Sequence, residues 1–125
     1  MGVPPRVDGG DPDELADALG PDRVAWLKAL ALSYEAGPYL FVHAGIVPNV
    51  PLDQQQPQDL LWIRSRFLDS NVDHGRMVIH GHTPSDEPVV KHNRIGIDTG
   101  AVFDGQLTAV VLDGDSPPLF LQARD

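Results

Sequence analysis

The chain has 125 residues, 42% of them hydrophobic and 22% charged, with a formal net charge of −9 at pH 7. This length allows one domain at most, the composition is that of a globular protein, and the negative charge argues against a nucleic-acid partner. The absence of cysteine excludes disulfides and thiolate metal ligands. No apolar run reaches the roughly 20 residues that cross a bilayer, so we expect a cytoplasmic protein with no membrane partner.

The N-terminal part of the sequence predicts a lead-in segment and two short helices. Residues 1–11 are rich in Gly, Pro and Asp, which predicts a mobile segment. Asp11 is a preferred N-cap and a proline follows it at the first helical position, so we expect a helix over 12–19 that Gly20 ends. Apolar residues at helical spacing predict a second helix over 21–31.

The middle of the sequence predicts strands, a loop and a further helix. A short strand is expected at 33–35, and the entirely apolar run at 39–42 predicts a buried strand. Residues 46–58 contain three prolines and predict a loop, at the end of which Pro57 is placed to begin a helix.

The C-terminal part is rich in strand-forming residues. Residues 69–75 predict a polar loop, and Gly-, Asp- and Asn-containing turns separate the runs that follow. The predicted strands lie at 76–80, 87–91, 94–98, 107–112 and 118–122. These elements indicate an α/β protein in which helices come first and most strands follow.

Two strand-forming runs end at a histidine beside a glycine. They are YLFVHAG at 39–45 and VIHGHTP at 78–84. Ligand sites of α/β proteins collect at strand ends, so we expect the imidazoles of His43 and His82 to converge as the histidine half of a metal site. Mn, Fe and Zn accept imidazole, and carboxylates complete such sites when two metals hydrolyse a phosphate ester. The alternative for a single strand-end histidine, which is the more common one, is a structural role.

Arg64 and three further histidines are the other polar side chains with a candidate role. Arg64 follows a Leu-Trp-Ile run, and its guanidinium could bind two phosphate oxygens, although an arginine after an aromatic residue usually lies at the surface. His74 and His92 lie in polar loops and are given structural roles. We expect His80 to point away from His82 if both lie in one strand, and therefore not to share a metal ion with it.

Four segments resemble, in the same order, the PPP-type serine/threonine protein phosphatases, with the closest likeness to bacterial and phage-lambda-type members. They are FVHAGI at 41–46, LWIR at 61–64, HGHTP at 80–84 and IDTGAVFDGQLT at 97–108. Those phosphatases belong to the calcineurin-like metallophosphoesterases. The resemblance implies metal-dependent hydrolysis of phosphoesters. It also implies a four-layer αββα sandwich of mixed sheets flanked by helices, to which this chain contributes mainly the second sheet.

The resemblance also implies roles for individual residues. His43 and His82 would both bind the second of two divalent metal ions, most often Mn, with Fe or Zn as other choices. Arg64 would grip the substrate phosphate, and the substrate would be a phosphoprotein or a small phosphoester. Residues 98–101 would close the site without being catalytic, with Asp98 hydrogen-bonded to the backbone. No catalytic residue is assigned.

The sequence departs from the family in lacking three motifs: Asp-x-His, Gly-Asp-x-x-Asp-Arg and Gly-Asn-His-Glu. These supply the first metal's ligands, the bridging aspartate and the general-acid histidine. We therefore expect residues 1–125 to be the C-terminal half of such a domain, whose partner is the missing N-terminal half. Two imidazoles without a bridging carboxylate should bind metal weakly or not at all, and the chain alone should have no appreciable phosphatase activity.

Two alternatives remain open. The first is a diadenosine tetraphosphate hydrolase, since that sister family shares the His-Ala-Gly and Asp-Thr-Gly elements. Its Gly-His motif tends to continue with Trp, so Thr83-Pro84 favours the protein phosphatase. The second is a non-catalytic remnant that binds a partner through exposed apolar surface.

Overall fold

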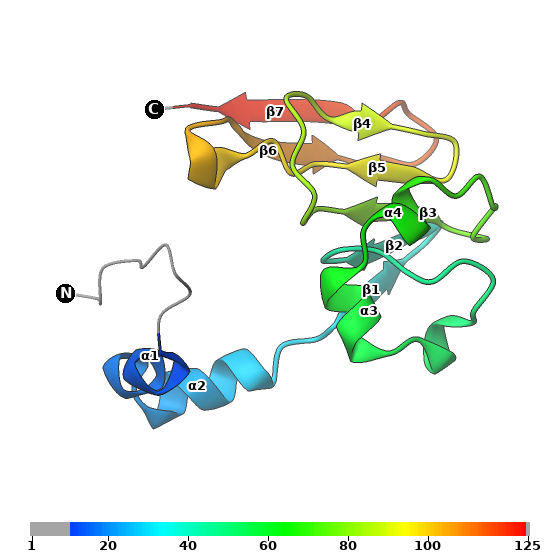
Figure 1. The fold of residues 1–125 in the computed structure, drawn as a ribbon. Coiled ribbons are helices and arrows are strands. Elements are labelled where there is room, and N and C mark those ends of the chain that lie inside the picture. The colour runs from blue at the N-terminus through cyan, green and yellow to red at the C-terminus, as the bar shows by residue number, and fades with distance from the viewer. Residues whose placement is uncertain (1–10, 125) are drawn as a thin grey trace. The chain divides into compact units, whose positions relative to one another are not determined.

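A computed structural model describes residues 11–124 of the chain (Figure 1). All but the last residue of the predicted mobile segment, at 1–10, lies outside the described residues. The chain divides into two compact units, residues 1–31 and 32–125. Within the described range, no helix is long and apolar enough to cross a membrane.

The first unit contains the two predicted helices, α1 (Pro12–Leu19) and α2 (Pro21–Lys28), which contact each other. Asp11 caps α1 as predicted, because its carboxylate accepts a hydrogen bond of 2.9 Å from the backbone N–H of Asp13. Gly20 ends α1 with a φ of 87°, a value that L side chains rarely adopt. Helix α1 has its predicted bounds, whereas α2 begins as predicted and ends at Lys28, before the predicted end at residue 31; neither helix contains a buried residue.

The second unit is built on a five-stranded mixed sheet, which confirms the α/β class. Its order is β1-β2-β3-β5-β4, with parallel pairing of β2 with β3 and of β3 with β5 and antiparallel pairing at both edges. The strands are β1 (Ser33–Ala36), β2 (Tyr39–Val42), β3 (Met77–His80), β4 (Val89–Val90) and β5 (Arg94–Gly96). Because β2 and β3 are parallel neighbours, their carboxyl ends lie side by side at the same end of the sheet.

One face of this sheet packs against two short helices, α3 (Pro57–Trp62) and α4 (Ser65–Leu68). A short 3-10 helix, Leu52–Gln54, precedes them. The hydrophobic core joins the two layers, with Leu40, Val42 and Val78 from the sheet and Leu60, Ile63 and Phe67 from the helices. The sequence predicted α3. The single turn of α4 was not predicted, because no side chain caps it and its apolar residues are too few to show a helical period.

The remaining strands form a separate antiparallel hairpin of β6 (Leu107–Val111) and β7 (Leu119–Ala123). It follows a second 3-10 helix, Ala101–Phe103. Hydroxyl contacts join the hairpin to the preceding loop, since Thr108 Oγ1 lies 2.6 Å from Thr99 Oγ1. Alternate residues of the hairpin expose apolar side chains to solvent, namely Leu107, Val111, Leu119 and Leu121.

Candidate metal centre

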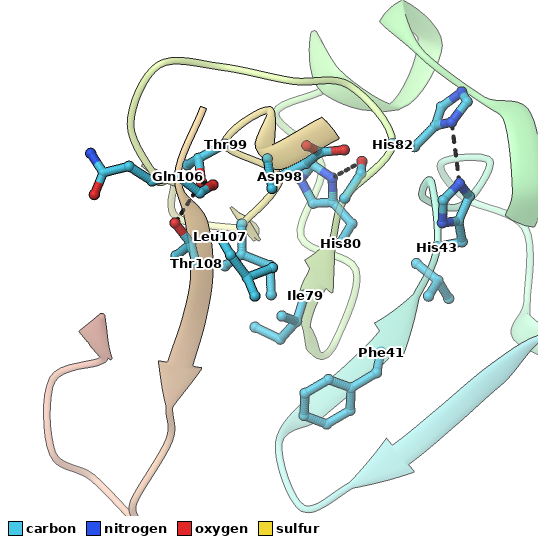
Figure 2. Close-up of a pocket in the computed structure, with 14 residues that line it drawn as sticks. Phe41, His43, Ile79, His80, His82, Asp98, Thr99, Gln106, Leu107 and Thr108 are labelled. Carbon is cyan, nitrogen blue, oxygen red and sulfur yellow. Dashed lines mark hydrogen bonds between the residues drawn. The ribbon is translucent and has the colours of Figure 1, made fainter. Parts of the chain in front are cut away.

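His43 and His82 meet at the carboxyl ends of β2 and β3 (Figure 2). The parallel register pairs Phe41 with Ile79. It continues beyond the strands, because the backbone N–H of Gly81 donates to the carbonyl of His43 at 2.8 Å. The side chains of His43 and His82, at the ends of these neighbouring strands, therefore lie close together. Nε2 of His43 lies 3.2 Å from Nδ1 of His82, with ring centroids 5.0 Å apart.

This separation fits two ligands of one metal ion. Two nitrogens bound at tetrahedral angles to zinc at about 2.05 Å lie about 3.3 Å from each other. The same spacing suits a hydrogen bond between a protonated and an unprotonated ring nitrogen. The predicted convergence of the two imidazoles is thus found, while their role as metal ligands stays a prediction.

The described residues do not complete a metal site around this pair. Residues 11–124 contain no group of three or more His, Asp or Glu side chains arranged to hold an ion. Stable metal sites usually have more than two protein ligands and some negative charge. The pair therefore provides part of a coordination sphere.

His82 is held in an unusual backbone conformation. Its φ is 72°, and the backbone N–H of Thr83 donates to the carbonyl of Gly81 at 2.9 Å, which closes a three-residue turn around it. A γ-turn with positive φ is rare and strained. Strained residues of this kind cluster at functional sites, where neighbouring structure holds them. The turn directs Nδ1 of His82 toward His43.

Electrostatics favours a neutral imidazole at His82. Burial is the main cause that lowers the pKa of His82, and the positive charges of Arg64 and His43 lower it further. The negative charge of Asp98 offsets only part of this effect. A neutral imidazole is the form that binds metal. The other nitrogen, Nε2, is buried without a hydrogen-bond partner among the described residues. That nitrogen would carry the proton when Nδ1 is a ligand.

Arg64 lies close enough to act on this centre. It directly precedes α4, its side chain is exposed, and its charge is the second-largest cause of the lowered pKa of His82. An exposed guanidinium near a metal site is free to bind an anion. Its predicted role in gripping phosphate stays a prediction.

A cavity of about 350 Å³ adjoins the histidine pair (Figure 2). It lies between the ends of β2 and β3 and the start of β6, and its lining includes Phe41, Ile79 and Leu107 together with His43, His82 and Asp98. Asp98 accepts a hydrogen bond of 3.1 Å from the backbone N–H of Gly100, which confirms the expected backbone contact. The cavity lining therefore contains both apolar and polar side chains.

His80 does not take part in the pair. Its ring is buried, with Nε2 3.0 Å from a guanidinium nitrogen of Arg94 and an edge-on contact with Phe67. The expected separation from His82 is found, but alternation along a strand does not explain it, because positions two apart in a strand share a face. The turn at His82 separates the two rings instead.

The sequence did not predict the supporting roles of Phe67 and Arg94. Phe67 is fully buried beneath the loop after β2, and Arg94 is a buried arginine in a central strand. No local pattern in the sequence marks either residue. For Arg94 the usual expectation is the opposite one, since arginine is almost never fully buried unless paired. The other two histidines lie in loops and make structural contacts: His74 packs on Phe67 of α4, and His92 Nε2 donates to the carbonyl of Asn71 at 2.9 Å.

Comparison with known proteins finds short, specific similarities. No protein-family model matches the chain. A stretch of 34 residues is 53% identical to the asymmetrical bis(5'-nucleosyl)-tetraphosphatase PrpE of Anoxybacillus flavithermus, covering 27% of this chain and 14% of that protein. Stretches of 33 residues are 52% identical to PrpE of Bacillus thuringiensis and 48% identical to PrpE of Bacillus mycoides, each covering 26% of this chain and 13% of the relative.

The chain is thus partly similar to bis(5'-nucleosyl)-tetraphosphatases, and it spans well under two thirds of their length. This similarity supports the diadenosine tetraphosphate alternative better than the protein phosphatase interpretation, although Thr83-Pro84 had favoured the latter.

Proposed function

We propose that this chain carries the two-histidine part of a metal-dependent phosphoester hydrolase site that acts on bis(5'-nucleosyl) tetraphosphates. The observation that carries the proposal is the 3.2 Å separation between Nε2 of His43 and Nδ1 of His82 at the ends of parallel strands. The partial identity to tetraphosphatases supports the substrate class.

In this proposal three side chains have defined tasks. His43 and His82 hold one divalent ion, Mn, Fe or Zn, through the two nitrogens that face each other. Arg64 donates its planar fork of N–H groups to phosphate oxygens of the substrate. When bound, a pair of divalent ions would activate water and neutralise charge on the phosphoryl oxygens.

The acidic ligands and the general acid would come from a segment that this chain does not carry. Together the two parts would form an αββα sandwich, in which the five-stranded sheet and the hairpin belong to the inner layers. The chain alone would then bind metal weakly and show no appreciable turnover, because it has no bridging carboxylate to hold two ions.

Cobalt titration tests the metal site. Aqueous Co²⁺ absorbs only weakly in the visible range, and imidazole ligands shift and strengthen this absorption; we expect such a change at millimolar Co²⁺ with the 125-residue chain. His43→Ala and His82→Ala should each remove it, and His92→Ala, which alters a loop contact, should leave it unchanged. Equal signals from all four proteins would overturn the proposal and favour a non-catalytic remnant.

A second candidate, a serine/threonine protein phosphatase, is favoured by the resemblance of the four ordered segments and by the Thr83-Pro84 continuation. A protein that joins this chain to the missing ligands separates the two candidates. We expect it to hydrolyse diadenosine tetraphosphate faster than a phosphoserine peptide, and the reverse preference would establish the second candidate.

A further inference from the structure

The outward face of α3 presents a tryptophan beside the histidine pair. Leu60 and Ile63 are buried in the core, whereas 65% of the surface of Trp62 is exposed. The carbonyl of Leu60 accepts a hydrogen bond of 2.9 Å from the backbone N–H of Ala44, the residue after His43. This bond fixes the end of α3, and with it Trp62, against the loop that carries a candidate metal ligand.

Trp62 also contacts the second histidine directly. Its ring centroid lies 5.5 Å from that of His82, and the two rings are perpendicular. Arg64, two residues further along, acts on the same imidazole through its charge. A planar apolar surface and a cation for which we propose a role in binding phosphate are thus both neighbours of His82.

We propose that the indole of Trp62 is the platform on which a base of the nucleotide substrate stacks. The proposal rests on the proposed function, since it assumes that a phosphate chain is held by the histidine-bound ion and Arg64. Exposed aromatic side chains stack on nucleobases with little regard to their identity, because every base has a π-face. A nucleotide offers a planar base next to its phosphates, which a phosphoserine peptide lacks.

The two tryptophans of the chain make the proposal testable by NMR. The indole N–H signals of the ¹⁵N-labelled chain are followed with zinc present, and the Trp26→Phe variant assigns the signal of Trp62. Three probes are added separately at millimolar concentration: diadenosine tetraphosphate, tripolyphosphate and a phosphoserine peptide. The side-chain Nε–H signal of Arg64 reports phosphate binding independently.

We expect the dinucleotide to shift the signals of both Trp62 and Arg64, and tripolyphosphate to shift that of Arg64 alone. The dinucleotide should bind about tenfold tighter than tripolyphosphate, which corresponds to stacking of one base. Trp62→Leu should abolish this preference without weakening tripolyphosphate binding. Trp62→Phe, which keeps an aromatic ring, should restore part of it.

The possible failures are distinct. If tripolyphosphate and the dinucleotide bind equally and the Trp62 signal does not move, the platform is overturned and the phosphate site stands. If no probe shifts Arg64, the phosphate site fails and the platform fails with it. If the phosphopeptide shifts Trp62 as strongly as the dinucleotide, the exposed indole is a surface for protein docking and the platform is overturned.

Discussion

Nε2 of His80 lies 3.0 Å from a guanidinium nitrogen of Arg94, and both side chains are buried. A guanidinium has only donors, so this imidazole nitrogen accepts and Nδ1 carries the proton. Nδ1 lies 3.2 Å from the carbonyl oxygen of Gly81, to which it donates. The same carbonyl closes the turn around His82. The buried pair thus braces the strained turn that directs His82 toward His43.

This arrangement predicts that acid destabilises the fold. Burial, the largest cause, lowers the pKa of His80 from 6.5 to about 4, so the unfolded chain binds more protons than the folded chain between those values. Stability should therefore fall as pH drops from 6.5 to about 4 and level off below. The contribution of His80 is at most about 3 kcal/mol. Urea denaturation across this pH range, with a chelator present, measures it.

His82 and His74 also have a lowered pKa and add to this slope, so a variant must isolate His80. His80→Gln offers an uncharged acceptor to Arg94 and cannot be protonated. We expect it to flatten the slope between pH 6.5 and 4. An unchanged slope would show that His80 does not cause the acid sensitivity.

Gly45→Ala should destabilise the fold by its contact with Phe67. An added Cβ at Gly45 would clash with Cδ2 of Phe67, whose ring is fully buried. Overpacking of this kind costs about 1–3 kcal/mol. Chemical denaturation measures the loss. The φ of Gly45, 156°, adds backbone strain to this clash, whereas at Gly81 an added Cβ would meet nothing closer than 3.6 Å. Gly81→Ala is therefore the comparison variant, and equal losses in the two variants would contradict the steric explanation.

Thr108→Val should loosen the β6–β7 hairpin. Oγ1 of Thr108 contacts Oγ1 of Thr99 at 2.6 Å and accepts a hydrogen bond of 3.2 Å from the side-chain amide of Gln122. Valine keeps the shape and loses both contacts, at a cost of about 1–2 kcal/mol. Amide hydrogen exchange in β6 and β7 should accelerate while exchange in β3 is unaffected. Uniform acceleration in both sheets would mean that these hydroxyls stabilise the whole unit.

Arg64→Ala should weaken phosphate binding and raise the pKa of His82. Since the charge of Arg64 lowers the pKa of His82, its removal should raise that pKa, which NMR titration of the His82 ring measures. Tripolyphosphate affinity should fall about tenfold, the loss expected for a charge-assisted contact. Arg66→Ala, an exposed arginine of α4, is the control and should change neither quantity. A similar fall in both variants would indicate general electrostatic attraction.

The sequence alone was enough to predict the helices and strands whose residues interact mainly with near neighbours in the chain. Asp11 and Gly20 define the ends of α1 through contacts made within a few residues, so the cap pattern was sufficient to place that helix. The apolar run at 39–42 likewise predicted β2, and the strand-end position of His43 and His82 was readable because each follows such a run.

Tertiary structure decided everything that depends on residues far apart in the chain. The 3.2 Å approach of His43 and His82 follows from the parallel pairing of β2 and β3, and no local pattern sets that register. The burial of Arg94 and its hydrogen bond to His80 could be seen only in the folded sheet. An arginine is expected at the surface unless the fold places a buried acceptor beside it. Chemical type was thus readable from single residues, whereas distances and protonation states came only from packing.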